Sequence, residues 1–227
     1  MELIVSLPQN DVAMARAAAD AGAHALKVHM NVEHAASGTR FGSFAEESDR
    51  VREIITAVDI PVGLMPGAGL QALPTAEELT SLANDGLDFV DIYTHHMPLW
   101  FIGLPLKLIV ALSEFKGFVE QPFYTTHLYT SAEQSTNRVY MCEASIFPKE
   151  EYGQPFTYHD YRRLRILQEY VDVPLLVPTQ KAITPADAQW LTRTGTGGLM
   201  IGAVVTGTSL ESIAKATTKY RQAIDSA

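Results

Sequence analysis

Polar side chains recur at every second position in several apolar segments of the sequence. In ALKVHMN, residues 25–31, these polar residues are Lys27, His29 and Asn31. Side chains on a β-strand point alternately to opposite faces, so the three would share one face, directed into a barrel interior. A buried lysine needs an oppositely charged partner or loses its charge. With a lowered pKa, Lys27 could act as a base or form a Schiff base.

Acidic residues occupy comparable positions in three later segments. Asp91 lies in FVDIYTHH, on the same predicted face as Tyr93 and His95, while Glu120 lies in GFVEQPF and Glu143 in YMCEASIF. These acids could balance the charge of the lysine. They could also act as general acid and base, because a lysine and nearby carboxylates push one another's pKa values apart. The predicted catalytic residues are Lys27, Asp91, Glu120 and Glu143.

Each candidate also has a purely structural alternative. Lys27 could form an ion pair near the barrel floor, and Asp91 could hydrogen-bond a neighbouring strand or loop. Glu143 follows Cys142, and an error of one position in its direction would turn it towards the helices. Cys142 is interpreted as a packed core thiol, since nothing nearby in the sequence would lower its pKa.

Further polar residues are candidates for substrate contacts. Arg40 lies in the long segment NVEHAASGTRFGSF, whose glycines could be the hinges of a lid, and an arginine can bind an anion through two hydrogen bonds. A surface excursion is the alternative. Lys181 lies at the predicted mouth of a strand and could instead be a solvated loop residue. His95 and His96 are adjacent, so both cannot point inward. The predicted substrate-binding residues are His29, Arg40, His95 and Lys181.

Some of these side chains are also of the types that bind Mg²⁺, Mn²⁺ or Zn²⁺, namely Asp91, His95, Glu120 and Glu143. Their spacing is not a local ligand motif, and a site would require them to converge in space. We therefore predict no metal site and no cofactor, and keep metal dependence as an alternative.

The elements that would position these residues alternate regularly along the chain. Apolar segments predict strands at residues 3–7, 25–31, 60–67, 87–96, 117–124, 138–147, 173–179 and 197–205. Helical segments follow them, including an apolar helix that ends near Gly117 and a weak helix over 130–137. This alternation indicates parallel strands with crossover helices. It predicts an α/β protein with a single (β/α)8 TIM barrel domain over residues 1–227, with a doubly wound open sheet as the alternative.

The eighth unit contains a pattern suited to binding a phosphate group. In GTGGLMIGAVVTGTSLESIAKA, residues 195–216, glycines flank a buried strand and a helix begins soon afterwards. Glycines let the backbone approach a phosphate closely, and a helix N-terminus supplies free N–H groups. The predicted phosphate-binding residues are Gly202, Ala203, Gly207 and Ser209. The alternative is that the glycines only permit tight turns and close helix packing.

The segment GLMIGAVVTG resembles the strand-eight element of the phosphate-binding TIM-barrel superfamily, also called ribulose-phosphate-binding barrels. The chain is loosely similar to aminosugar-phosphate epimerases within that superfamily. The resemblance implies a phosphate site after strands seven and eight. Those epimerases carry a catalytic lysine on strand three, whereas the corresponding segment here, PVGLMPG, has no charged residue.

Composition excludes several other classes of protein. The formal net charge of −9 argues against an extended nucleic-acid surface, because neutralising phosphates requires clustered lysine and arginine. The chain has one cysteine, no signal-peptide pattern, and no apolar run long enough to span a bilayer. We expect a cytoplasmic protein without nucleic-acid or membrane partners. The segment MPLWFIGLPLKL could form the interface of a homo-oligomer or, alternatively, a buried helix.

The predicted function is that of an enzyme acting on a small phosphorylated metabolite. Proton transfer next to a carbonyl is the favoured chemistry, as in an isomerase or epimerase of a sugar phosphate. One alternative is an aldolase or other carbon–carbon lyase that uses Lys27 as a Schiff-base residue. Another alternative is a non-catalytic barrel that binds a phosphorylated ligand or FMN.

Overall fold

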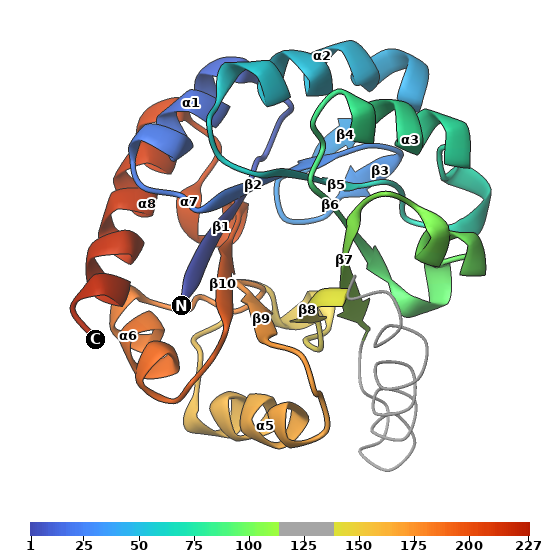
Figure 1. Ribbon diagram of the computed structural model, residues 1–227. Helices are drawn as coiled ribbons and strands as arrows, with labels where there is room; N and C mark the ends of the chain where they lie inside the picture. The colour runs from blue at the N-terminus through green and yellow to red at the C-terminus, as the bar shows by residue number, and fades with distance from the viewer. Residues whose placement is uncertain (114–138) are drawn as a thin grey trace.

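Eight parallel strands close into a barrel within the described part of the chain, residues 1–113 and 139–227 of this computed structural model (Figure 1). Around the barrel the strands run in the order β1, β10, β9, β8, β7, β6, β5 and β2. Their bounds are β1 Glu2–Ser6, β2 Ala25–His29, β5 Val62–Met65, β6 Phe89–Tyr93, β7 Lys107–Leu112, β8 Val139–Ala144, β9 Leu175–Pro178 and β10 Gly198–Ile201. The predicted (β/α)8 barrel is confirmed.

Helices cover the outside of the barrel (Figure 1). They are α1 Val12–Asp20, α2 Phe44–Ala57, α3 Ala76–Asn84, α5 Tyr158–Glu169, α6 Pro185–Arg193, the short α7 Ala203–Thr206 and α8 Leu210–Asp225. Capping boxes begin α3, α5 and α6 at Thr75, Thr157 and Thr184, where each threonine hydroxyl accepts a backbone N–H three residues on. None of the helices in the described ranges has the length and apolar character needed to cross a membrane.

The middle of the barrel interior is filled by apolar side chains from most of its strands. This apolar layer consists of Ile4, Ala25, Phe89, Ile109, Met141, Leu176 and Met200. The ring of Phe89 lies against β5 at Gly63, where an added Cβ would stand 2.0 Å from the ring. A glycine is therefore needed at that position to let the barrel close around the phenyl ring. The layer forms a packed floor beneath the C-terminal ends of the strands.

One predicted region is wrong. Residues 107–112, assigned from the sequence to an apolar helix, form β7, the fifth strand of the barrel. Short 3-10 turns, η2 at Thr94–His96 and η3 at Leu99–Gly103, precede it. The prolines on either side of η3 disfavour a continuous helix, and the segment KLIVAL contains residues that favour strands. The strand predicted at 117–124 and the helix predicted at 130–137 lie outside the described residues.

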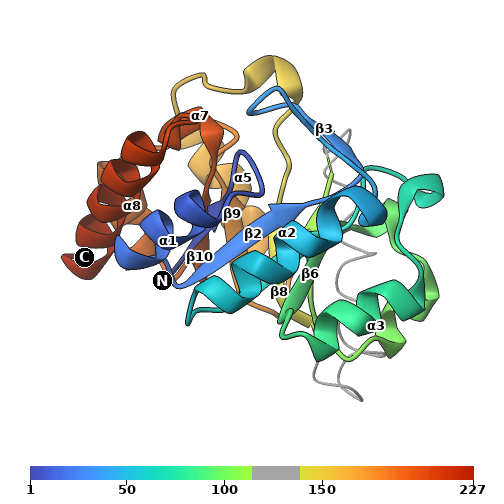
Figure 2. The ribbon, with the colours of Figure 1, turned by 90° about the horizontal axis from the view of Figure 1, so that it is seen from above.

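A small hairpin interrupts the barrel pattern after β2. Its strands, β3 Val32–His34 and β4 Thr39–Phe41, pair antiparallel. A hydrogen bond of 2.7 Å from the Asn31 N–H to the Gly42 carbonyl joins the two ends of the hairpin to each other. The predicted polar excursion is thus an ordered hairpin, which Figure 2 shows extending from the barrel beside β2.

Candidate functional site

The C-terminal ends of the strands surround a cavity of about 350 Å³. Residues of the β3–β4 hairpin and of the segment at η4, Lys149–Glu151, complete its wall. The cavity lies directly above the apolar layer, because on each strand the residue two positions further along points into the barrel again. This is the end of a (β/α)8 barrel at which active sites are found.

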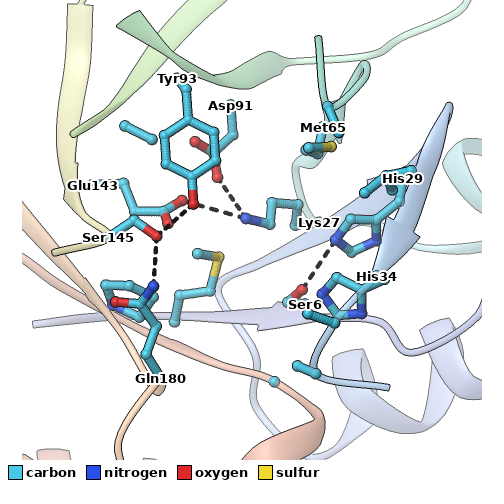
Figure 3. Close-up of a pocket in the computed structure, with 18 of the residues that line it drawn as sticks. Ser6, Lys27, His29, His34, Met65, Asp91, Tyr93, Glu143, Ser145 and Gln180 are labelled. Atoms are coloured by element: carbon cyan, nitrogen blue, oxygen red, sulfur yellow. Dashed lines mark hydrogen bonds and ion pairs between the residues drawn. The ribbon is translucent and has the colours of Figure 1, made fainter. Parts of the chain in front are cut away.

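Lys27 lies between two acidic side chains at the base of the cavity (Figure 3). Its Nζ donates to Asp91 Oδ2 at 2.7 Å and to Glu143 Oε2 at 3.3 Å. The three side chains come from β2, β6 and β8 and are at most 10% exposed. The alternation read from the sequence therefore brought these three predicted residues together correctly.

The charges in this cluster depend strongly on one another. Burial lowers the pKa of Lys27, but the charges of Asp91 and Glu143 outweigh that effect and raise its pKa above the ordinary value. Burial and the neighbouring charge of Glu143 raise the pKa of Asp91 well above its ordinary value. Burial opposes ionisation of Glu143 as well, yet Lys27 and hydrogen bonds lower its pKa. The charge of each group in the cluster therefore depends on the other two.

A chain of neutral polar groups lies beside the charged cluster (Figure 3). The Tyr93 hydroxyl is 2.9 Å from Ser145 Oγ, and Gln180 Nε2 donates to Ser145 Oγ at 2.9 Å. Gln180 Nε2 also donates to the Tyr152 hydroxyl at 2.7 Å. Ser145, Tyr152 and Gln180 were not predicted as site residues. Ser145 follows Glu143 by two positions, so the same alternation could have identified it.

Two histidines form the opposite side of the cavity. The rings of His29 and His34 are 4.6 Å apart, and the ring of Phe41 is 4.7 Å from that of His29. His29 Nε2 lies 3.3 Å from Ser6 Oγ. Burial holds the pKa of His29 well below its usual range and lowers that of His34 to about 4. Both imidazoles are therefore uncharged at neutral pH.

Some buried polar atoms of residues that line the cavity have no protein partner. Among the described residues, the buried side-chain atoms without a hydrogen bond are His29 Nδ1, Asp91 Oδ1 and His96 Nδ1. All three residues line the cavity. Buried polar atoms in folded proteins are nearly always hydrogen-bonded, because leaving one unpaired costs free energy. All three unpaired atoms thus belong to residues of the same cavity.

The predicted phosphate-binding residues divide into two groups. Gly202 lines the cavity, caps the N-terminus of α7, and donates its N–H to Thr179 Oγ1 at 3.0 Å, while Ala203 begins that helix. Gly207 has a φ of 67° and ends α7, a conformation that favours glycine. Ser209 caps α8 by accepting the Ser212 N–H at 3.2 Å. Gly207 and Ser209 therefore have clear structural roles, and neither lines the cavity.

Arg40 and His95 lie away from the cavity wall. Arg40 is exposed on β4, 3.8 Å from Glu33 and 3.9 Å from Glu46. His95 is exposed because β6 ends at Tyr93 and the chain enters η2, where strand alternation no longer applies. The neighbouring His96 lines the cavity instead.

Lys181 is buried but also lies outside the cavity wall. Its Nζ is 2.5 Å from Glu151 Oε2 and 3.8 Å from Asp160 Oδ2, so it joins the η4 segment to α5. The preceding residue, Gln180, faces the cavity in its place. The other predicted catalytic residue, Glu120, lies outside the described residues.

The polar residues of the cavity do not form a metal centre in the described part of the chain. No group of three or more histidine, cysteine, aspartate or glutamate side chains there is arranged to hold a metal ion. The position between the two carboxyl groups is taken by the ammonium of Lys27.

Comparison with known proteins identifies the fold but no close relative. No family model matches the sequence, and no curated protein is significantly similar to it. Thiamine phosphate pyrophosphorylase from Pyrococcus furiosus has a TM-score of 0.63 and 17% identity, over 99% of this chain and 96% of that chain. Phosphoribosyl anthranilate isomerase from Thermus thermophilus has a TM-score of 0.64 and 14% identity, over 100% and 99%.

A third similar structure is 3-hexulose-6-phosphate synthase from Salmonella typhimurium, with a TM-score of 0.63 and 13% identity. The match covers 100% of this chain and 99% of that chain. At these low identities, the likeness to the three solved structures shows the fold alone. The chain therefore shares the single (β/α)8 barrel of enzymes named for phosphorylated compounds.

Proposed function

We propose that this protein is an enzyme that moves a proton next to a carbonyl group of a small phosphorylated metabolite, as an isomerase or epimerase does. The observation that carries the proposal is the ammonium of Lys27 between two buried carboxyl groups, at the end of a barrel where active sites are found. The unpaired polar atoms of His29, Asp91 and His96 around the same cavity support a bound polar substrate.

The unequal ionisation of the carboxyl groups suits acid–base catalysis. Glu143, as the carboxylate, would remove a proton from the carbon beside the carbonyl. The ammonium of Lys27 would stabilise the negative charge that develops on the substrate oxygen. Asp91, as the protonated carboxyl, would return a proton to the substrate. One proton is taken up and one released, and exchange with water would restore the starting state.

The alternative Schiff-base mechanism is less well supported. An amine must be uncharged to attack a carbonyl carbon. A neighbouring carboxylate keeps the ammonium form of Lys27 stable, and the pKa of Lys27 is raised despite its burial. The geometry therefore favours an electrostatic role for Lys27.

A phosphorylated substrate is supported by the other end of the cavity. Gly202 and Val204 line it at the beginning of α7, where the first N–H groups of a helix have no intrahelical acceptor. Lys149 lies at the cavity wall and is exposed, so it could contact an anion there. The structural neighbours named for phosphorylated compounds fit the same interpretation.

The proposal can be tested in two steps with matched sugars and sugar phosphates. Ligand at about 100 times its Kd should raise Tm by about 5–10 °C, and only phosphorylated compounds should do so. Compounds that bind are then incubated in D₂O, and NMR records the exchange of hydrogen beside the carbonyl. We expect exchange with the native protein and with the Asp49→Asn control on exposed α2, but not with Glu143→Gln.

Two results would contradict the proposal in different ways. Binding without exchange would indicate a non-catalytic barrel for phosphorylated ligands. The absence of binding across a broad panel would indicate that the glycines of the eighth unit serve only the local packing.

A further inference from the structure

We propose that Lys181 is a positioning residue that acts through Glu151. The ion pair between them holds the η4 segment in place and so keeps Lys149 and Tyr152 at the cavity wall, where these two side chains would contact the substrate. The contact with substrate rests on the proposed function, whereas the position of the η4 segment does not.

The η4 segment belongs to a long excursion of the chain, over residues 145–157, between β8 and α5. Figure 2 shows this excursion in yellow, extending from the barrel on the side of the β3–β4 hairpin. Lys149 and Tyr152 line the cavity, although Lys149 is exposed. A wall built outside the strands keeps its place through the contacts that its residues make with the barrel.

The residues that follow β9 supply such contacts. Gln180 faces the cavity, and its Nε2 donates to the Tyr152 hydroxyl at 2.7 Å (Figure 3). Its Oε1 accepts the Phe147 N–H at 3.2 Å, and its backbone carbonyl accepts the Gly153 N–H at 2.9 Å. Lys181, the next residue, lies outside the cavity wall, beside α5. Consecutive residues therefore hold the excursion from its cavity side and from its outer side.

The surroundings of Lys181 fix its ammonium in one place. Its Nζ lies 2.5 Å from Glu151 Oε2, 3.8 Å from Asp160 Oδ2 and 5.5 Å from the centre of the Phe147 ring. The lysine side chain is only 6% exposed, so these groups take the place of water around the charge. Asp160 Oδ2 also accepts from Thr157 in the capping box of α5, which ties the ammonium to the start of that helix. The fixed cation therefore directs the more exposed Glu151.

An ion pair of this kind suits the fixing of geometry better than the addition of stability. Removing charged groups from water is costly, and an apolar side chain at position 181 could fill the same space without that cost. The side chain of Glu151 is 34% exposed, so water would solvate its carboxylate if the ammonium were removed. The turn that carries it could then move away from the barrel. We expect the effect of Lys181 to be concentrated at the η4 segment.

Amide hydrogen exchange measured by mass spectrometry tests the position of the η4 segment without any ligand. The N–H groups of residues 151–154 all donate to backbone acceptors in the folded protein. Lys181→Met keeps an apolar side chain of similar length and removes the charge. Amide exchange over 151–154 should become about tenfold faster, because the segment opens more often once a charge-assisted hydrogen bond is lost. Exchange in the strands should stay native.

Two further variants separate the ion pair from other causes. Glu151→Ala removes the partly exposed partner, should have the same local effect, and provides the test if Lys181→Met fails to fold. Adding it to Lys181→Met should change amide exchange little further, because residues that act through one another have non-additive effects. Glu150→Ala is the matched control, since it removes the same charge from an exposed position of the same turn and should leave exchange native.

Steady-state kinetics test the contact with substrate. For a sugar phosphate that the native protein converts, Lys181→Met should raise KM several-fold and leave kcat near its native value. Lys149 and Tyr152 would occupy the wall for less of the time, whereas the charged cluster on the strands would be unchanged. Lys107→Met, which removes an exposed ion pair with Asp88 where β7 begins, at the other end of the barrel, should change neither constant.

The proposal is overturned if amide exchange over 151–154 stays native in both Lys181→Met and Glu151→Ala, or if Lys181→Met accelerates exchange equally throughout the chain. Faster local exchange with a native KM would overturn the contact of this wall with substrate. Faster local exchange without conversion of any sugar phosphate would retain the position of the η4 segment and reject the proposed function. Conversion of a sugar phosphate, with native amide exchange in both variants, would do the reverse.

Discussion

Two levels of the barrel interior, only two residues apart along each strand, have opposite characters. At the lower level, Phe89 packs into space left by Gly63 and no polar atom intervenes. At the upper level, Asp91 on the same strand lies in a cavity with an unpaired oxygen. The lower level gains stability from close packing, while the upper level keeps charges and space that packing alone would remove.

The difference shows how closely a barrel can place a stable floor and a reactive site. A residue pointing into the barrel recurs every second position, so one strand supplies both levels without changing its backbone. Substitutions at the lower level should therefore change the free energy of unfolding, and those at the upper level should change chemistry and its pH dependence.

Replacing Lys27, a residue of the upper level, should produce the largest effect, and that effect should be on the stability of the fold. Lys27→Met leaves two buried carboxyl groups without a cation, so we expect a loss of about 3–5 kcal/mol in the free energy of unfolding at pH 7. In the variant the folded carboxyls bind protons more tightly than the unfolded ones, so its stability falls as pH rises. Urea unfolding at pH 5 and pH 7 measures this loss. An equal loss at both pH values would contradict the charge explanation.

Replacing the proposed base should separate activity from stability. Glu143→Gln should reduce the rate of hydrogen exchange by roughly a hundredfold to ten-thousandfold. Its stability should change little, because Asp91 can then ionise and become the sole charged partner of Lys27. Exchange kinetics and urea unfolding of the same preparation test both statements. A variant that retains native exchange would exclude Glu143 as the base.

Adding a methyl group to the apolar layer should lower stability and leave the exchange activity unchanged, the opposite of the result expected for Glu143→Gln. In Gly63→Ala the new Cβ would lie 2.0 Å from the ring of Phe89, so we expect a loss of about 1–3 kcal/mol in stability from overpacking. Exchange activity per folded molecule should be retained. A second substitution, Phe89→Leu, should recover part of the loss by making room. If the stability losses of Gly63→Ala and Phe89→Leu were additive in the double variant, the Phe89 ring would not be the group that the new Cβ contacts.

The smallest expected effect is the contribution of His34 to the pH dependence of the free energy of unfolding. Burial lowers the pKa of His34 to about 4, so the unfolded chain binds a proton that the folded chain does not between that value and the ordinary one. Stability should therefore rise with pH between about 4 and 6.5. In His34→Gln this rise should be smaller, by on the order of 1 kcal/mol, because the side chain is partly exposed. Thermal unfolding across that pH range measures the slope.

The sequence predicted those parts of the site that depend on strand alternation. Lys27, Asp91 and Glu143 lie within regular strands, so the two-residue period correctly placed them on one face. His95 and Lys181 lie at or beyond strand ends, where a turn or a change of phase decides the direction. Alternation within a strand carries no information on those positions.

Contacts between segments far apart in the sequence also could not be predicted. The hydrogen bond between Phe147 and Gln180 joins two loops, and only the folded barrel brings them together. The wrong prediction of an apolar helix ending near Gly117 has a local cause. A short apolar segment such as 107–112 suits a buried helix as well as a buried strand. The prolines beside it were the signal that favoured a break.

The pairing of β1 with β10 has a consequence for synthesis of the chain. Glu2 is opposite Gly198 and Val5 is opposite Ile201, so β1 completes its hydrogen bonds only after residues 198–201 have been translated. Until then one edge of β1, with the buried side chains of Leu3, Ile4 and Val5, has no neighbour. Unpaired apolar edges promote aggregation. Molecular chaperones that shield the nascent chain should therefore raise the yield of native barrel most strongly before β10 emerges from the ribosome.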